Sequence, residues 1–352
     1  MADWKSSMQQ TFEYYVVDPG TWKDQKLLTN VISSTICRDS TVETLGSATI
    51  DITGSIDECY VRIYLVTVQN GIRERHALGT YIVQSPSTVF DGKSVTNSVD
   101  AYTPLLELKE SLPPIGHYVP KNFNIMSSVY TIIREKARAP VVKTSCDTKM
   151  YYDFVASPNE TWLEYVTALI QNADHRLELD EMGRILFSPN QDTASLNPVW
   201  TYDDGNSSIL YPDITINRDM YDIPNVVEVV YSRGADTYNI RVVNDDKNSP
   251  ISTVNRGREI VRRVTNPDLV GDPTSSQVKL YAQRLLSEWS TLEYTISYTH
   301  AYCPVRVGDC VMLDCERAGL KNVKAKVISQ NIQCEPGCPV SEKAVFTTKL
   351  WR

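Results

Sequence analysis

The chain has 352 residues, a formal net charge of -8 at pH 7 and 42% hydrophobic residues. This length exceeds what one hydrophobic core usually serves, so we expect two or three domains. The acidic balance argues against a nucleic-acid binder, because affinity for a phosphate backbone comes mostly from Lys and Arg. The sequence has no apolar run near the roughly 18–20 residues that span a bilayer, and its start lacks the apolar region of a signal peptide. We therefore expect neither a membrane protein nor ordinary secretion.

The first hundred or so residues alternate Val, Ile, Thr and Tyr with polar residues, between turns rich in Gly, Pro, Asp and Asn. This is the pattern of short strands with one buried face. Six strands are predicted, at residues 12–17, 31–37, 47–53, 60–68, 79–84 and 95–102. A run of short strands with turns between them indicates a barrel or sandwich. Pro113-Pro114 and Gly116 mark its end, so we assign residues 1–110 to a β domain.

A helical period follows. A first helix is predicted at residues 127–139, with Val129, Ile132 and Ile133 on one face and Pro140 as its stop. A second is predicted to begin with Ser157 as its cap and Pro158 at its first position. Its apolar face carries Trp162, Val166, Leu169, Ile170 and Ala173. Residues 176–187 predict a tight hairpin, so we assign residues 111–200 to a small α+β insertion domain.

The β pattern returns beyond about residue 205. Strands are predicted at residues 225–231 and 239–243, and further strands close the chain. One helix, at about residues 274–290, interrupts them. It is predicted to open at Asp272-Pro273, and its apolar face carries Val278, Ala282, Leu285, Leu286 and Trp289. We assign residues 201–352 to a second β domain.

Two stretches of the chain follow the same pattern. Residues 81–93 and 326–338 are each an alternating run that reaches a Gly-bearing turn. Each is followed by a second alternating run, at residues 95–102 and 343–351, and preceded by a strand and turn, at residues 60–71 and 310–319. The match is one of pattern, with few identical residues. It predicts two copies of one β unit on either side of the insertion.

Five segments carry a resemblance to a known family. They are the opening Phe12-Glu-Tyr-Tyr-Val-Val-Asp-Pro-Gly-Thr-Trp, Leu78-Gly-Thr-Tyr-Ile-Val, Ile223-Pro-Asn-Val-Val-Glu-Val, Asn244-Asp-Asp-Lys-Asn-Ser-Pro-Ile-Ser-Thr with Gly257-Arg258, and Val307-Gly-Asp-Cys-Val. Together they resemble the baseplate hub proteins of bacteriophage tails, a family similar to the base of the type VI secretion spike. The likeness runs in order along nearly the whole chain, while each motif alone is degenerate. It departs most in the cysteine-rich C-terminus.

The resemblance implies a mainly β fold in which two related, tube-like β-barrel domains bracket the small two-helix and hairpin domain. It also implies a homotrimer with pseudo-sixfold symmetry, since three chains with two copies each present six equivalent surfaces. Such a ring joins the hexameric tail tube, or a distal tail protein, to the trimeric central spike and forms a channel for DNA ejection. The tape measure protein is a further candidate partner. The implied location is the virion tail, after synthesis in the bacterial host cytoplasm.

The residues offer little for catalysis. Four His occur, and the sequence contains none of the G-x-S-x-G, P-loop, G-x-G-x-x-G or H-E-x-x-H motifs. Asp174 beside His175 can orient an imidazole, but a cation at a helix end is the ordinary reading. The acid pairs Asp203-Asp204 and Asp245-Asp246 are typical of solvated turns. We therefore predict no enzyme and no cofactor. The alternative is a cell-wall-acting or carbohydrate-binding tail-tip module, with its site at residues 118–190.

The eight cysteines raise a metal question. Cys303, Cys310, Cys315, Cys334 and Cys338 fall close together, and two close pairs are how zinc ribbons deliver four thiolates. Cys310 and Cys315 lie at the ends of a predicted strand and point to opposite faces, which argues against a shared zinc. Cys334 and Cys338 flank a Glu-Pro-Gly turn that can bring them within disulfide range after release into an oxidising medium. Buried free thiols are the ordinary alternative.

The basic cluster Arg256, Arg258, Arg262 and Arg263 can bind an anion, but Glu259 lies inside it. A solvated strand or interface ion pairs are the favoured reading. The net charge further predicts a bore that is acidic or neutral, with these four arginines away from it or paired with acids.

Overall fold

The computed structural model describes residues 2–90, 92–93, 95–218, 220–233, 236–267 and 274–351. The chain forms two compact units, Met1–Ile214 with Ser297–Ala344, and Thr215–Ile296 with Val345–Arg352. These units group the chain differently from the three predicted domains, whose boundaries stay predictions. Among the described helices, none is both long and apolar enough to cross a membrane.

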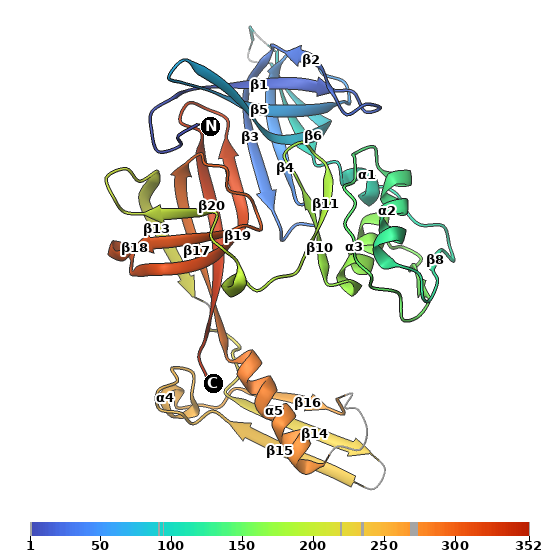
Figure 1. Ribbon diagram of the computed structural model, residues 1–352, viewed down its shortest axis with the longest axis vertical. Helices are drawn as coiled ribbons and strands as arrows, with labels where there is room; N and C mark the ends of the chain where they lie inside the picture. Colours follow the sequence, from blue (N-terminus) through green and yellow to red (C-terminus); the bar gives the residue numbers. More distant parts are fainter. Residues whose placement is uncertain are drawn as a thin grey trace. The chain divides into compact units, whose positions relative to one another are not determined.

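Strands dominate the structure, which confirms the mainly β prediction (Figure 1). The first half of the first unit contains β1 (Gln9–Val17), β2 (Asp24–Leu28), β3 (Val31–Asp39), β4 (Gly46–Thr53), β5 (Tyr60–Gln69), β6 (Ile72–Phe90) and β7 (Val95–Tyr102). All six predicted strands are present. β2 has no apolar alternation and was missed. β6 is far longer than predicted because the polar residues at its start pair with β5.

The second set of strands has the same order as the first. It comprises β12 (Trp200–Asp203), β13 (Leu210–Arg218), β17 (Thr291–Ala301), β18 (Cys310–Cys315), a short 3-10 helix η2 (Glu316–Ala318), β19 (Leu320–Gln333) and β20 (Pro339–Lys349). Within one 13-stranded sheet the two orders are β1-β5-β6-β7-β4-β3 and β12-β18-β19-β20-β17-β13. At equivalent positions in the two orders stand β5 and β18, β6 and β19, and β7 and β20. These are the same segments whose sequence patterns match.

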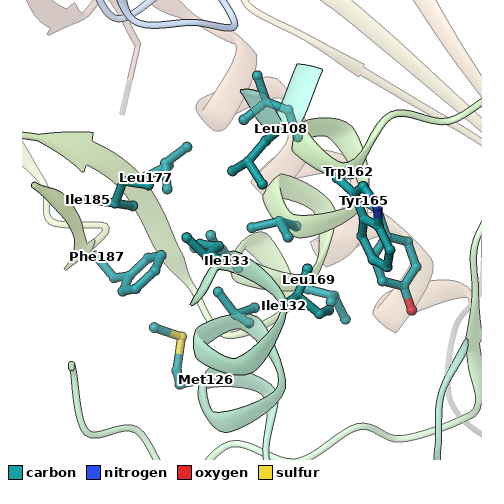
Figure 2. Close-up of a cluster of buried hydrophobic side chains, with 14 of the residues drawn as sticks. Leu108, Met126, Ile132, Ile133, Trp162, Tyr165, Leu169, Leu177, Ile185 and Phe187 are labelled. Carbon is teal, nitrogen blue, oxygen red and sulfur yellow. The ribbon is translucent and has the colours of Figure 1, made fainter. Parts of the chain in front are cut away.

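The insertion forms its own core. It contains α1 (Leu106–Lys109), β8 (Tyr118–Val119), α2 (Ile125–Lys136), β9 (Phe154–Val155), α3 (Trp162–Asn172), β10 (His175–Leu179), β11 (Ile185–Pro189) and a short 3-10 helix η1 (Thr193–Ser195). Figure 2 shows Leu177, Ile185 and Phe187 of the β10–β11 hairpin beside the helices, where they join the cluster of Ile133 and Leu169. Burying this shared apolar face holds the hairpin against α2 and α3.

The predicted start of α3 is wrong. The helix begins at Trp162 with Thr161 as its N-cap, rather than at Ser157. Thr161 and Glu164 form a capping box, in which each side chain accepts from the other residue's backbone N–H. Ser157 instead belongs to a separate turn with Glu160. The stronger reciprocal cap, four residues later, therefore sets the boundary.

The second unit is a three-stranded sheet with one covering helix. Its sheet order is β15 (Asp236–Val243), β14 (Val226–Arg233), β16 (Val261–Thr265), and its helices are α4 (Thr253–Arg256) and α5 (Ser275–Trp289). Val278, Ala282 and Leu286 of α5 pack on Val227 and Val229, as the helical period predicts. Thr274 caps α5, while the predicted opening residues Asp272 and Pro273 lie outside the described part of the chain.

Candidate functional site

The two halves of the large sheet meet where β19 pairs with β3. The pairing is antiparallel and runs from Ser329 opposite Asp39 to Gln333 opposite Thr35. Within it Ile332 lies opposite Ile36, and both side chains are buried in one hydrophobic core. We call this pairing, together with the side chains that cross it, the junction. It makes one continuous sheet of the two halves.

The tip of the β10–β11 hairpin contacts residues of both halves of the sheet at the junction. Glu181, in the hairpin turn, has one carboxylate oxygen 2.5 Å from the guanidinium of Arg306 and the other 3.8 Å from that of Arg38. Arg38 comes from β3, whereas Arg306 precedes β18. The Glu181 side chain is only 15% exposed, so this carboxylate is partly desolvated between two cations from different halves.

Backbone contacts fix the same hairpin tip. The carbonyl of Met182 accepts from Trp22 Nε1 at 2.7 Å and from Arg62 at 3.1 Å. Arg62 is almost fully buried, where it also pairs with Asp24 at 2.7 Å. Gly183 adopts a positive φ of 74°, and a Cβ there would lie 2.7 Å from the Cβ of Thr80. Only glycine therefore lets the turn approach the first half this closely.

A hydrogen-bond chain leads from the junction into the second half. Arg38 donates to Gln330 Oε1 at 3.2 Å, and Gln330 in turn donates to Glu342 at 2.7 Å. Glu342 accepts from the hydroxyl of Tyr298 and lies 3.3 Å from His300 Nε2. The side chains of His300 and Glu342 are both 0% exposed. The junction is thus continuous with a fully buried ion pair.

The surroundings of His300 favour its charged form. Nδ1 donates to the carbonyl of Ala301 at 2.8 Å, which leaves Nε2 to donate to Glu342. Burial alone lowers the pKa of His300, but its hydrogen bonds to Cys303 and to the Glu342 carboxylate outweigh burial and raise the pKa to about 10. Burial, with the nearby Glu342 charge, raises the pKa of Tyr202 and Tyr298 well above the ordinary value.

This polar cluster contains the residue types of a catalytic triad, since Cys303 lies 3.8 Å from His300 Nδ1. Its geometry does not suit substrate binding. Cys303, His300 and Glu342 are all buried, and the Tyr202 hydroxyl lies between them, 3.1 Å from His300 Nε2 and 3.3 Å from Cys303 Sγ. A nucleophile must meet its substrate, so we assign the cluster a structural role.

The other histidines have structural contacts. His175 Nδ1 lies 2.6 Å from the carbonyl of Ala173, the C-cap residue of α3, so this side chain stands at the helix end. Asp174 accepts from Asn190 instead. His76 packs against Trp4, and His117 lies between Trp162 and Tyr165.

The predicted acid and arginine groups lie in separate places. Asp203 pairs with Lys5 at 3.1 Å, and Asp204 pairs with Arg317 at 3.4 Å. In the second unit, Asp246 accepts from Asn248 within a turn, while Asp245 is exposed. Arg262 pairs with Asp222 at 3.1 Å, and Arg263 with Glu228 at 2.7 Å. Arg256 donates to the carbonyls of Ile223 and Met220, and Arg258 is exposed.

All eight cysteines are free thiols in the structure. Cys310 lies by the carbonyl of Thr193 and Cys315 by that of Tyr202, so the two point to different segments. Cys334 and Cys338 are buried at the ends of a turn in which Cys338 N–H donates to the Glu335 carbonyl. Burial raises the pKa of Cys334 to about 11. Their disulfide stays a prediction. Within the described ranges, no group of three or more His, Cys, Asp or Glu could hold a metal ion.

Sequence reasoning missed the junction. One signal was present for its buried end, because His300 falls in phase with the buried Ile296 and Tyr298 of its strand, and Glu342 falls in phase with Val340 and Ala344. A charged residue at an inward position demands a partner. Glu181 gave no such signal, since it lies in a hairpin turn and both of its arginine partners are far away in sequence.

The overall fold matches solved tail proteins. No protein-family model and no curated protein matches the sequence. Among solved structures, the tail protein from Neisseria meningitidis MC58 aligns with a TM-score of 0.64 at 12% identity, over 96% of this chain and 97% of that one. The 43 kDa tail protein of prophage MuSo2 from Shewanella oneidensis aligns with a TM-score of 0.63 at 12% identity, over 95% and 98%.

A third match is to a chain of a two-protein complex. A chain of the half-lidded Francisella PdpA-VgrG complex aligns with a TM-score of 0.58 at 7% identity, over 97% of this chain but 58% of that one. Identities this low establish the fold alone. The chain therefore has the fold shared by these tail proteins and by a chain of the PdpA-VgrG complex, which confirms, at the level of fold, the resemblance that the sequence motifs indicate.

Proposed function

We propose that this protein is a structural hub of a phage tail: a trimeric ring with pseudo-sixfold symmetry that joins the hexameric tail tube, or a distal tail protein, to the trimeric central spike. The observation that carries the proposal is the repeated strand order within one sheet. Three chains with two equivalent halves each offer six equivalent surfaces on one side, while the ring keeps threefold symmetry elsewhere. A protein that joins a hexameric tube to a trimeric spike needs this combination of symmetries.

The junction supports the same role. In a ring that carries load between tube and spike, the two halves of each chain's sheet need to be fixed to each other. Glu181, placed between arginines of both halves, and the continuous β19–β3 pairing meet that need. The buried His300–Glu342 pair is the end of the same hydrogen-bond chain. These contacts hold the two halves of the chain together, and we assign the protein no enzymatic activity.

Further parts of the proposal come from the resemblance to tail hub proteins and from the acidic net charge. The ring would form a channel for DNA ejection, with a bore that is acidic or neutral. The tape measure protein is a further candidate partner. The protein would be made in the bacterial host cytoplasm and act in the virion tail. Electron microscopy of the purified protein, or of isolated tails, tests the ring by showing its symmetry. Threefold symmetry with six similar lobes is expected, and a true hexamer of this chain would contradict the proposal.

One observation favours the second candidate, a carbohydrate-binding tail-tip module. The insertion exposes several aromatic side chains, namely Tyr118 (51%), Phe123 (58%), Tyr151 (87%) and Tyr152 (56%). Aromatic rings with a polar tip are suited to ligands that are apolar on one face and hydroxylated at the edge. Sedimentation with purified cell-wall sacculi tests this candidate. Retention that is lost in Tyr151→Ala with Tyr152→Ala would support it, and equal recovery in the supernatant with and without sacculi would exclude it.

A further inference from the structure

The two halves of the sheet can be aligned residue by residue. In the first half, Thr53 N–H donates to the Asn30 carbonyl at 2.9 Å; in the second, Ala301 N–H donates to that of Ile209 at 2.9 Å. Each bond joins the end of a strand, β4 or β17, to the residue before its neighbour. The neighbours β3 and β13 are both nine residues long, so they correspond position by position.

A second pair of bonds aligns β6 with β19. Val83 N–H donates to the Cys59 carbonyl at 2.9 Å, and Val327 N–H donates to that of Asp309 at 2.9 Å. Both strands also change phase just beyond this point. β6 has a register shift between Val83 and Ser85, and the buried side of β19 moves from Val327 to Gln330. The correspondence therefore continues through the irregularity, and β6 residues 85–89 match β19 residues 329–333.

These matched segments have different surroundings within one chain. Residues 329–333 of β19 extend past β18 and pair with β3 at the junction. Residues 85–89 of β6 likewise extend past β5, whose pairing ends at Tyr60 opposite Ile82, and among the described pairings they contact β7 on one side only. The strand that corresponds to β3 is β13, which ends the sheet order. Each chain thus holds one completed junction and the two separate parts of another.

We propose that residues 85–89 of β6 in one copy pair antiparallel with β13 of the next copy, repeating the β19–β3 junction between chains. This inference rests on the proposed ring and names its interface. By the alignment, Val89 lies opposite Ile214, Thr88 opposite Thr215 and Ser87 opposite Ile216. The contact is head to tail, so it closes a ring when the third copy meets the first. It also covers two strand edges that have no partner among the described pairings, and such edges are open to unwanted pairing in a lone chain.

Exposed apolar side chains support this register. Val89 is 59% exposed and Ile216 is 38% exposed, both unusual for strand residues of their type. In the proposed pairing Val89, Ile214 and Ile216 share one face, so the three bury one another across the interface. Thr88 and Thr215 meet on the opposite face, at the positions that Ile332 and Ile36 occupy in the core of the existing junction.

The test is disulfide trapping between two single variants. Opposite residues of an antiparallel pair have Cα atoms about 4.5–5.5 Å apart, within disulfide range. Val89→Cys and Ile214→Cys are co-expressed with different tags, and the trimer, in solution or in isolated tails, is oxidised. We expect a covalent dimer that contains both tags. Each single variant expressed alone and the unaltered chain, with its eight native cysteines, should give no such dimer.

The outcomes separate this inference from the ring itself. A trimer by mass that gives no mixed-tag dimer overturns the edge assignment and leaves the hub proposal standing. A dimer from Val89→Cys alone shows a like-with-like contact and also overturns it. A chain that stays monomeric in solution and in tails overturns the hub proposal. As a second readout, Ile216→Asp should weaken the trimer by about tenfold or more. Ile72→Asp, at a more exposed position (63%) on the far end of β6, should leave it unchanged.

Discussion

His300 and Glu342 form the most deeply buried ion pair of the described structure, and the pH dependence of stability should report it. A histidine whose folded pKa is about 10, above its ordinary value, binds its proton more tightly in the folded state. Its contribution is therefore fully present below about pH 6.5 and is lost as the pH rises through about 10. The free energy of unfolding should fall across this window.

We expect His300→Gln to remove that dependence. The substitution should lower the free energy of unfolding by about 3–5 kcal/mol near neutral pH, because it leaves Glu342 buried without its cation. Urea unfolding of both proteins between pH 6 and pH 10 provides the measurement. The difference between them should shrink toward high pH, and a difference that stays constant with pH would contradict a charged His300.

The hairpin carboxylate makes a separate prediction. Glu181→Gln should destabilise the chain by about 1–3 kcal/mol, since two arginines lose a partly buried charged partner. Glu316→Gln is the matched control, because its pair with Lys321 is exposed on both sides, 68% and 73%. Exposed pairs contribute about 0–1 kcal/mol. Equal losses in the two variants would show that Glu181 does not brace the junction.

The cysteine pair tests the oxidation state of the C-terminal turn. If Cys334 and Cys338 join after release, thiol counting on denatured mature particles should find two fewer free thiols than the eight in the sequence. Reduction before counting should restore all eight. A full count without reduction would show that both remain thiols, as burial in one core cluster permits.

In the β10–β11 turn, both the backbone conformation and the packing constrain Gly183. Gly183→Ala combines a left-handed φ of 74° with a Cβ contact of 2.7 Å to Thr80. Gly116→Ala shares the left-handed conformation, at φ 82°, but its Cβ would meet nothing within 4 Å. The control should cost about 1–2 kcal/mol from strain alone. Gly183→Ala should cost about 1–3 kcal/mol more from overpacking. Equal melting temperatures would mean that the turn is free to withdraw.

Sequence patterns predicted the strands and helices whose own face is buried. Alternation located the strands around Tyr60 and Val95, and the helical period located α2 and α5, because each pattern reflects burial of that segment's own face. The start of α3 was misplaced because two possible caps stand four residues apart and only contacts decide between them. Glu181 was missed for a similar reason, since a carboxylate in a turn links the two halves only when arginines distant in sequence pair with it.

At the scale of the whole molecule, charge sets the expectation for DNA. With a net charge of -8, the assembled protein should let DNA pass without holding it. In a mobility-shift titration we expect no binding that strengthens steeply as salt is lowered, which is the mark of phosphate contacts. Tight, salt-sensitive binding would indicate a bore lined by Lys and Arg and would contradict an acidic or neutral channel.

In the proposed hub, each chain supplies two equivalent halves to a ring of three. The native mass of the assembled protein, measured by mass spectrometry of the purified protein or of a hub complex released from tails, tests it most directly. We predict a mass of three times the 39.8 kDa of one chain. A strictly monomeric chain in intact tails, or a mass of six chains, would contradict it.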